Sequence, residues 1–168
     1  LTRYYDVNLK KRRNEILKKF KSYSFYKIDI CDDAKLKKVF KKEKPDVVIH
    51  LAAQAGVRYS IENPKSYVES NFFGTFNILE AIKENEIKHS LIASTSSVYG
   101  ANEDMPFKEI DKADHQLSFY ASTKKSCEVI SHSYSHLYDL PITCFRFFTV
   151  YGPWGRPDMA LFKFTKSI

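Results

Sequence analysis

The sequence predicts an α/β fold, in the form of a doubly wound parallel sheet with helices on both faces. Short runs rich in β-branched residues alternate with longer segments of helical periodicity, the pattern of repeated strand-helix-strand units. The run DVVIHLA at residues 46–52 is apolar with little alternation, as expected of a strand covered on both faces. The long polar segment 99–117 follows a predicted strand, and ligands bind at such strand ends.

The elements can be justified in chain order. We expect four strands, at residues 24–30, 46–52, 90–94 and 142–147, and three helices between them, at residues 33–42, 64–84 and 119–138. Asn63 and Pro64 supply a cap and a first-turn proline for the second helix, and Pro141 follows the end of the third. The basic segments 8–21 and 34–44 also carry apolar residues at helical spacing.

Composition limits the class of protein. A chain of 168 residues with 43% hydrophobic content is long enough for one domain with a real core. No apolar run approaches the roughly 20 residues of a membrane-spanning helix, and the N-terminus has no apolar signal core. Three widely spaced cysteines, Cys31, Cys127 and Cys144, lack any C-x-x-C pattern. We therefore expect a cytoplasmic protein with thiols, no metal site and no membrane association.

The net charge of +7 is concentrated in the first 44 residues. The outer faces of the two basic helical segments explain this excess better than a nucleic-acid surface does. No nucleic-acid motif is present, and no basic stripe carries interleaved aromatic residues. We expect no nucleic-acid partner.

The segment SFYASTKKS at residues 118–126 places Tyr120 four positions before Lys124. On a helix, side chains at this spacing share a face, so an ammonium can lie beside the phenol. A tyrosine normally loses its proton near pH ~10, and a neighbouring positive charge favours the phenolate that a general base needs. An ordinary surface helix produces the same spacing, so the pair alone leaves both interpretations open.

Four other segments carry polar groups at or after predicted strand ends. Asp29 ends the first strand or caps the next helix, and Arg58 follows the small residues after the second strand and suits a phosphate or carboxylate. The third strand ends in four consecutive hydroxyl residues, 94–97, and the fourth runs into a Gly/Pro-rich loop with Thr149 and Arg156. Each segment alone is a weak signal, but their order and spacing are specific.

One expected motif is missing. A dinucleotide-binding sheet normally opens with a strand, a glycine-rich turn and a helix, and no variant of G-x-G-x-x-G occurs among the five glycines. The chain is therefore either a different α/β domain or one that begins after that element.

Together these motifs resemble the extended short-chain dehydrogenase/reductases, and within them the nucleotide-sugar epimerases. The resemblance covers nearly the whole chain and rests on the Tyr-x-x-x-Lys pair, the hydroxyl-rich strand end, HLAAQAGVR at 50–58 and the segment 67–77. AAQAGVRYS and RFFTVYGPWGRPDMA are most similar to the UDP-glucuronate 4-epimerases. The resemblance implies a Rossmann-like fold, NAD as cofactor and a nucleotide sugar as substrate.

The resemblance also implies roles for individual residues. Tyr120 would act as base and acid at the sugar 4-hydroxyl, Lys124 would lower the pKa of Tyr120 and hold the nicotinamide ribose, and Thr95 with Ser96 would bind the substrate oxygen. The implied cofactor-binding set is Asp29, Ile30, Leu51, Ala52, Ala53, Gln54, Asn71, Ala93, Ser94, Tyr120, Lys124 and Phe147. The implied substrate-binding set is Arg58, Thr95, Ser96, Thr149 and Arg156. Helices 64–84 and 119–138 are similar to those through which family members form homodimers.

Other activities on the same fold stay open. A 4,6-dehydratase needs an Asp-Glu pair after the threonine, where this sequence has Ser96 and Ser97, so we rank it below an epimerase. A decarboxylase or a non-catalytic nucleotide-binding domain is the further alternative.

Compared with the members of the family, the chain is expected to be an interior fragment. Residues 1–150 would be a partial NAD-binding domain and 151–168 the start of a substrate-binding region, and the fragment alone would be weakened in cofactor affinity and stability.

Overall fold

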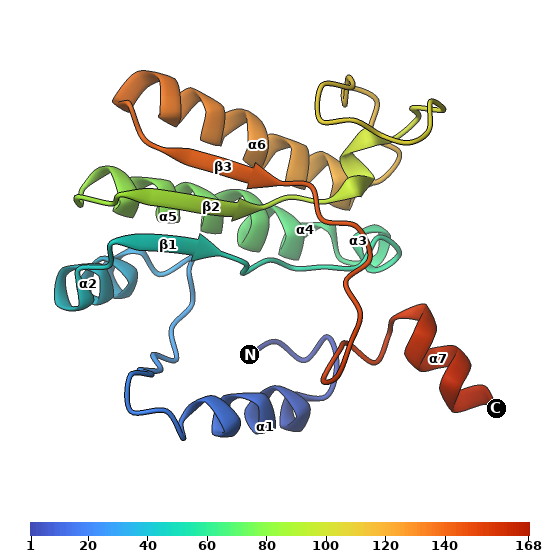
Figure 1. Ribbon diagram of the computed structural model, residues 1–168, viewed down its shortest axis with the longest axis horizontal. Coiled ribbons are helices and arrows are strands. Elements are labelled where there is room, and N and C mark those ends of the chain that lie inside the picture. The colour runs from blue at the N-terminus through green and yellow to red at the C-terminus, as the bar shows by residue number, and fades with distance from the viewer. The chain divides into compact units, whose positions relative to one another are not determined.

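The computed structural model describes all residues from 1 to 168, and the chain divides into two compact units. One unit is Ile28–Phe148, and the other combines Leu1–Lys27 with Thr149–Ile168. The larger unit holds a three-stranded parallel sheet in the order β1-β2-β3 (Figure 1). The strands are β1 (Val47–His50), β2 (His89–Ala93) and β3 (Ile142–Phe145).

The helices of the larger unit agree closely with the predicted ones. They are α2 (Asp33–Glu43), α3 (Tyr59–Glu62), α4 (Pro64–Tyr67), the π-helical segment η1 (Val68–Phe73), α5 (Gly74–Lys83), the 3-10 turn η2 (Ser96–Tyr99) and α6 (Phe119–Tyr138). The helix predicted at residues 119–138 is confirmed at both ends. The helix predicted at 64–84 is one helical run, widened by the π-helical segment in its middle.

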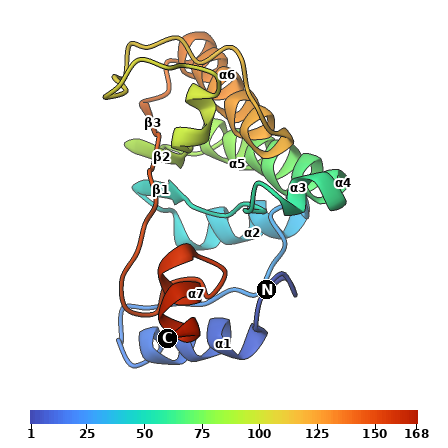
Figure 2. The ribbon, with the colours of Figure 1, turned by 90° about the vertical axis from the view of Figure 1, so that its right-hand side faces the viewer.

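The helices of this unit cover a single face of the sheet, which differs from the prediction of helices on both faces. In Figure 2, α5 and α6 lie to one side of the three strands. Both connections, from β1 to β2 and from β2 to β3, move across the sheet in the same direction. Because parallel crossovers are right-handed, successive crossovers in one direction place their helices on the same face. Helix α2 packs on this face too, since Leu36 and Phe40 join a core cluster with Val48.

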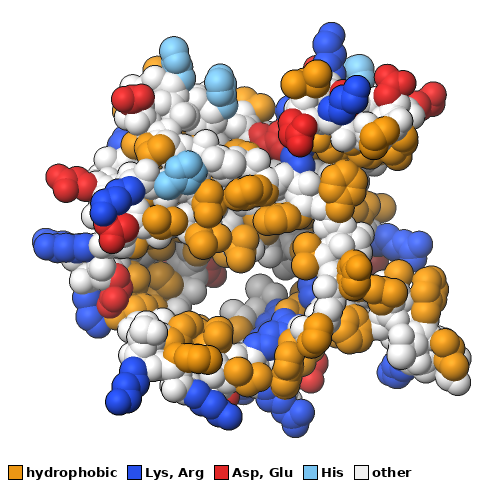
Figure 3. All heavy atoms as spheres, in the orientation of Figure 1, with side chains coloured by type: hydrophobic (Ala, Val, Ile, Leu, Met, Phe, Trp, Pro, Cys, Tyr) orange, Lys and Arg blue, Asp and Glu red, His pale blue; other side chains and the backbone are white.

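The covered face forms the hydrophobic core. Ile78, Leu79 and Ile82 of α5 pack with α2 and β1, and Ile130 and Tyr134 of α6 pack against the same cluster. The opposite face of β1 carries Val47 and Ile49, which are 48% and 60% exposed. Figure 3 shows hydrophobic side chains gathered over the strands on that face.

The strand predicted at residues 24–30 is wrong. These residues form no strand, and Asp29 heads a tight turn in which its carboxylate accepts the backbone N–H of Cys31 at 2.9 Å and its carbonyl accepts that of Asp32. A strand exists only by pairing, and no strand of the sheet pairs with this segment. Its apolar residues Ile28 and Ile30 instead pack against the core.

The smaller unit contains α1 (Val7–Leu17) and α7 (Ala160–Ser167). The helix predicted in the basic segment 8–21 is confirmed as far as Leu17. Arg13 donates to the carbonyl of Gly155 at 2.9 Å and Tyr4 donates to Asp158 at 3.0 Å, so these contacts join the two ends of the chain. No helix of the chain is both long and apolar enough to span a membrane.

Candidate active site

Tyr120 and Lys124 lie in the first two turns of α6, as the sequence predicts. The Ser118 hydroxyl caps the helix by accepting the N–H of Ala121 at 3.1 Å. The backbone N–H of Tyr120 donates to the Ser60 hydroxyl at 3.2 Å, and the Tyr120 ring meets the ring of Tyr67 edge-on at 6.1 Å. These contacts from α3 and α4 fix the start of α6.

Lys124 is only 2% exposed. Burial lowers the pKa of this lysine, and the groups that act in the opposite direction are Cys127, Cys144 and Glu128. A buried ammonium on the helix face that also carries Tyr120 has the character of a functional group rather than of a solvated surface lysine.

The predicted hydroxyl groups lie where β2 ends and η2 begins. Thr95 caps η2 by accepting the N–H of Ser97 at 3.2 Å, and the N–H of Ser96 donates to the carbonyl of Phe147 at 2.8 Å. Helix α6 packs against η2. The structure therefore brings the turn that begins at Thr95 and Ser96 against α6, the helix that carries Tyr120 and Lys124.

A second strand end is held by Asn71 of η1. Its side chain is buried, accepts the N–H of Gln54 at 2.7 Å, and donates to the Gln54 carbonyl at 3.1 Å and to Thr123 at 3.0 Å. Leu51, Ala52 and Ala53 precede Gln54 and are exposed. Asn71 thus binds the predicted cofactor segment 51–54 to α6. The π-helical turn places this amide inward, and such turns are frequent at functional sites.

Beneath Lys124 runs a chain of buried polar groups. His50 lies 3.0 Å from the Thr75 hydroxyl, which in turn lies 3.4 Å from the Cys127 sulfur. Burial, with a smaller effect of the Lys124 charge, lowers the pKa of His50 to about 4. His50 is therefore neutral at neutral pH and adds no second positive charge beside Lys124.

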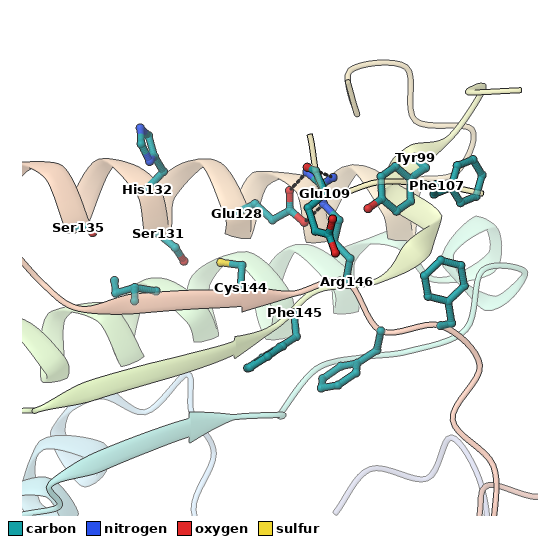
Figure 4. Close-up of a pocket in the computed structure, with 13 residues that line it drawn as sticks. Tyr99, Phe107, Glu109, Glu128, Ser131, His132, Ser135, Cys144, Phe145 and Arg146 are labelled. Carbon is teal, nitrogen blue, oxygen red and sulfur yellow. Dashed lines mark hydrogen bonds and ion pairs between the residues drawn. The ribbon is translucent and has the colours of Figure 1, made fainter. Parts of the chain in front are cut away.

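Glu128 and Arg146 form an ion pair between α6 and the residue after β3, shown in Figure 4. Nε and Nη2 of Arg146 donate to the two carboxylate oxygens at 3.0 and 3.1 Å. The pair borders a cavity of about 550 Å³ beside β3, which Tyr99, Phe107, His132 and Cys144 also line. None of Tyr120, Lys124, Thr95 and Ser96 lines this cavity, so it is distinct from the acid–base pair.

The remaining predicted site residues have less definite surroundings. Asp29 is exposed in its turn, Ile30 packs on the core, Arg58 is exposed before α3, and Ala93 is half-buried at the end of β2. The exposed ring of Phe147 stacks on Phe145. Thr149 and Arg156 belong to the smaller unit, where Nε and Nη2 of Arg156 bind Asp158 at 3.0 and 2.8 Å.

The family model described as GDP-mannose 4,6 dehydratase matches residues 2–168. The chain belongs to this family. The match confirms the resemblance to nucleotide-sugar epimerases and dehydratases that the motifs carry.

Curated relatives are similar over nearly the whole chain. A probable UDP-glucuronate 4-epimerase of Rhizobium meliloti is 56% identical over 168 residues, which are 100% of this chain and 49% of the relative. UDP-glucuronate 4-epimerase 3 of Arabidopsis thaliana is 51% identical over 98% of this chain and 38% of its own length. The chain thus spans about half or less of these relatives.

A solved structure gives the same result for the fold. The crystal structure of UDP-glucuronic acid 4-epimerase from Bacillus cereus, in complex with UDP-glucuronic acid and NAD, matches with a TM-score of 0.88 at 37% identity. The match covers 95% of this chain and 50% of that one. It confirms a Rossmann-like α/β fold.

Sequence reasoning missed Glu128, Arg146, Tyr67 and Asp158 as parts of these arrangements. Glu128 had a usable signal, because it follows Lys124 by four residues and so shares its helix face. Arg146 had none, since its partner Glu128 is set by tertiary packing, whereas Asp158 lies only two residues after its partner Arg156.

Proposed function

We propose that the chain carries the acid–base site of an NAD-dependent nucleotide-sugar 4-epimerase that interconverts UDP-glucuronate and UDP-galacturonate. The observation that carries the proposal is the pair Tyr120 and buried Lys124 beside the Thr95–Ser96 turn. It occurs in a chain 56% identical to a probable UDP-glucuronate 4-epimerase. The proposed reaction is the one for which this relative is named, and the groups that we propose for it are the side chains of Tyr120, Lys124, Thr95 and Ser96.

In the proposed reaction, Tyr120 removes the proton of the sugar 4-hydroxyl and later returns it. The Lys124 ammonium stabilises the Tyr120 phenolate and holds the nicotinamide ribose. Thr95 and Ser96 donate hydrogen bonds to the substrate oxygen. The chemistry that NAD would supply when bound is the acceptance of hydride from C4 and its return to the opposite face of the sugar. Because burial lowers the pKa of Lys124, this ammonium is a group that titrates more easily than an exposed lysine.

The residues after β1 fit the proposed cofactor. Small, exposed Ala52 and Ala53 leave their backbone accessible, and Asn71 holds the adjoining Gln54 in place. We propose that Leu51 to Gln54 line the pyrophosphate and ribose, with Ala93, Phe147 and the ends of β1 and β2 alongside, and that Asp29 and Ile30 contact adenine. The Ser94 hydroxyl donates to Glu128 at 2.6 Å, so we assign Ser94 to the cofactor only through its backbone.

We propose that Arg58, Thr149 and Arg156 bind the anionic parts of the substrate. Two nitrogens of Arg156 already bind Asp158, so a substrate carboxylate takes the remaining nitrogen or displaces this partner. We further propose that residues 1–150 form part of the NAD-binding domain and that residues 151–168 begin the substrate-binding region. We also propose that the full-length protein is a cytoplasmic homodimer, whose subunits pair through the helices at 64–84 and 119–138.

A 4,6-dehydratase is the second candidate, because the matching family model carries that description. That elimination needs an acid and a base after the threonine, and Ser96 and Ser97 are poor substitutes for carboxyl groups. The serines favour the epimerase.

The test is product analysis by NMR with the protein at its full natural length. Incubation with UDP-glucuronate and NAD should give UDP-galacturonate, and Tyr120→Phe should lower turnover by ~10²–10⁴-fold because the proton acceptor is lost. Tyr138→Phe, at the far end of α6, is the matched control and should keep full activity.

Other products would contradict the proposal. Release of carbon dioxide from UDP-glucuronate would identify a decarboxylase, and formation of a 4-keto-6-deoxy sugar in a separate incubation with a UDP-hexose would identify a dehydratase. Unchanged turnover in Tyr120→Phe would remove Tyr120 from the mechanism.

A further inference from the structure

Glu128 connects three separate elements at one carboxylate. It lies on α6, accepts the Ser94 hydroxyl from the end of β2 at 2.6 Å, and accepts the two-pronged donation of Arg146 from just beyond β3. Lys125 lies 3.5 Å from the same carboxylate. Figure 4 shows the Glu128 and Arg146 side chains pointing toward each other from α6 and β3.

The place of this carboxylate relative to the acid–base pair is fixed by helix geometry. Glu128 follows Lys124 by four residues and Tyr120 by eight, so all three lie along one face of α6. Its partner Ser94 immediately precedes Thr95. One carboxylate therefore sets both the depth of α6 against β2 and the position of the Thr95 turn.

Arg146 extends the connection to the loop after β2. Its guanidinium lies 4.8 Å from the centre of the Tyr99 ring, and Tyr99 stacks on Phe107 at 4.5 Å. A third nitrogen of Arg146 reaches the carbonyl of Glu109 at 3.4 Å. The ion pair thus also anchors part of the long polar loop.

The charge of Glu128 acts on Lys124 as well. The groups around Lys124 include His50 from β1, Cys127 and Glu128 from α6, and Cys144 from β3. Burial raises the pKa of both thiols, so they stay protonated at neutral pH, and His50 stays neutral. Burial alone would raise the pKa of Glu128, but hydrogen bonds from Arg146 and Ser94 lower it overall. Among these four groups, Glu128 is the one that holds a negative charge near Lys124.

We infer that Glu128 and Arg146, joined to Ser94, are positioning residues that hold the Tyr120–Lys124 face of α6 in register with Thr95. This inference rests on the proposed function, because the geometry that it protects is that of the acid–base pair. Such residues touch neither substrate nor cofactor, and their loss displaces the groups that do.

The test compares Glu128→Gln with Glu80→Gln in the protein at its full natural length. Glu80 is a matched control, because this carboxylate on α5 accepts the hydroxyl of Tyr134 from α6 and also pairs with Lys83 of its own helix. Tyr134 lies 14 residues beyond Tyr120, or about 21 Å along the helix. Glu128→Gln should lower kcat by about 100-fold, the loss typical of a misplacement near 1 Å, with KM for the nucleotide sugar within about threefold of the parent. Glu80→Gln should leave kcat within about twofold of the parent protein.

The pH dependence of kcat distinguishes a loss of positioning and charge at the acid–base pair from a general loss of stability. Without the carboxylate, the Lys124 ammonium loses its proton more easily, so the alkaline limb of kcat should move to lower pH in Glu128→Gln and stay in place in Glu80→Gln. Arg146→Gln should lower kcat as well, and the double variant with Glu128→Gln should lose little more than the worse single variant.

Equal kcat losses in Glu128→Gln and Glu80→Gln, or a normal kcat and pH profile in Glu128→Gln, would overturn the inference while leaving the proposed function intact. Circular dichroism of each variant confirms that it is folded, and Ser94→Ala supplies a milder substitution if Glu128→Gln does not fold. Absence of epimerase activity in the parent protein would count against the proposed function itself.

Discussion

The two faces of the sheet differ more in burial than in apolar character. The face covered by α5 and α6 includes His50, Ser90 and Cys144, whereas the uncovered face of β1 carries Val47 and Ile49. Polar groups on the covered face lie near the predicted acid–base pair, since His50 lies beneath Lys124.

In this sheet, therefore, a side chain's burial cannot be inferred from whether it is apolar. Leu79 and Ile82 of α5 are fully buried on the covered face, and burial is what lowers the pKa values of His50 and Lys124. The uncovered face has the composition of a buried surface but is in contact with solvent. Apolar side chains there contribute little to the stability of this unit.

The largest expected effect is a difference in the free energy of unfolding between substitutions on the two faces. Leu79→Ala should lower the free energy of unfolding of the 168-residue chain by about 2–5 kcal/mol, because Leu79 is fully buried and its loss leaves a cavity. Ile49→Ala, at a side chain 60% exposed, should cost well under 1 kcal/mol. Urea unfolding of both variants measures the contrast, and equal losses would show that the β1 face is buried in solution.

The same contrast explains what the sequence could and could not predict. The run 46–52 has apolar residues at successive positions, so it gives no sign of which face is covered. Handedness decides that question, and it follows from the order of the strands, which a sequence pattern does not contain. Helix 119–138 was predictable to the residue because its Ser118 cap and the following Pro141 are local signals.

Prediction failed where pairing or packing decides the structure. Residues 24–30 have the composition of a strand, but no strand of the sheet pairs with them. Tyr120, Lys124 and Thr95 could be proposed as site residues from spacing and resemblance, whereas the Arg146 partner of Glu128 lies 18 residues away on another element. The Asn71 contacts likewise depend on a π-helical turn that residue periodicity does not reveal.

A pH titration tests the covered face through His50. The pKa of this residue is about 4 in the folded chain and near the ordinary value of 6.5 in the unfolded chain. As the pH falls below 6.5, His50 becomes protonated in the unfolded chain, whereas in the folded chain it stays neutral until about pH 4. His50 therefore makes the free energy of unfolding decrease as the pH falls from 6.5 to 4, by about 3 kcal/mol in total.

The measurement is urea unfolding at several pH values in the parent chain and in His50→Asn. The variant keeps a polar group beside Thr75 but cannot titrate, so its stability should depend less on pH in this window. His89→Gln, at a half-buried histidine on β2, is the control and should leave the parent dependence in place. The same slope in His50→Asn and the parent would show that His50 is accessible to protons in the folded chain.

The smallest of the three effects concerns the amide that joins the covered face to the segment after β1. Asn71→Ala removes the acceptor of the Gln54 N–H and the donor to Thr123 and to the Gln54 carbonyl, and so takes these partners from the buried backbone of Gln54. We expect a loss of about 1–3 kcal/mol in the free energy of unfolding and faster hydrogen exchange at the Gln54 amide. Asn77→Ala is a matched control on the same helical run, where a half-buried asparagine donates to the carbonyl of Ile30 at 3.0 Å. If exchange at Gln54 rises equally in both variants, the segment 51–54 is held by the fold as a whole. A rise confined to Asn71→Ala means that one side chain of the π-helical turn holds the strand end that we assign to the cofactor.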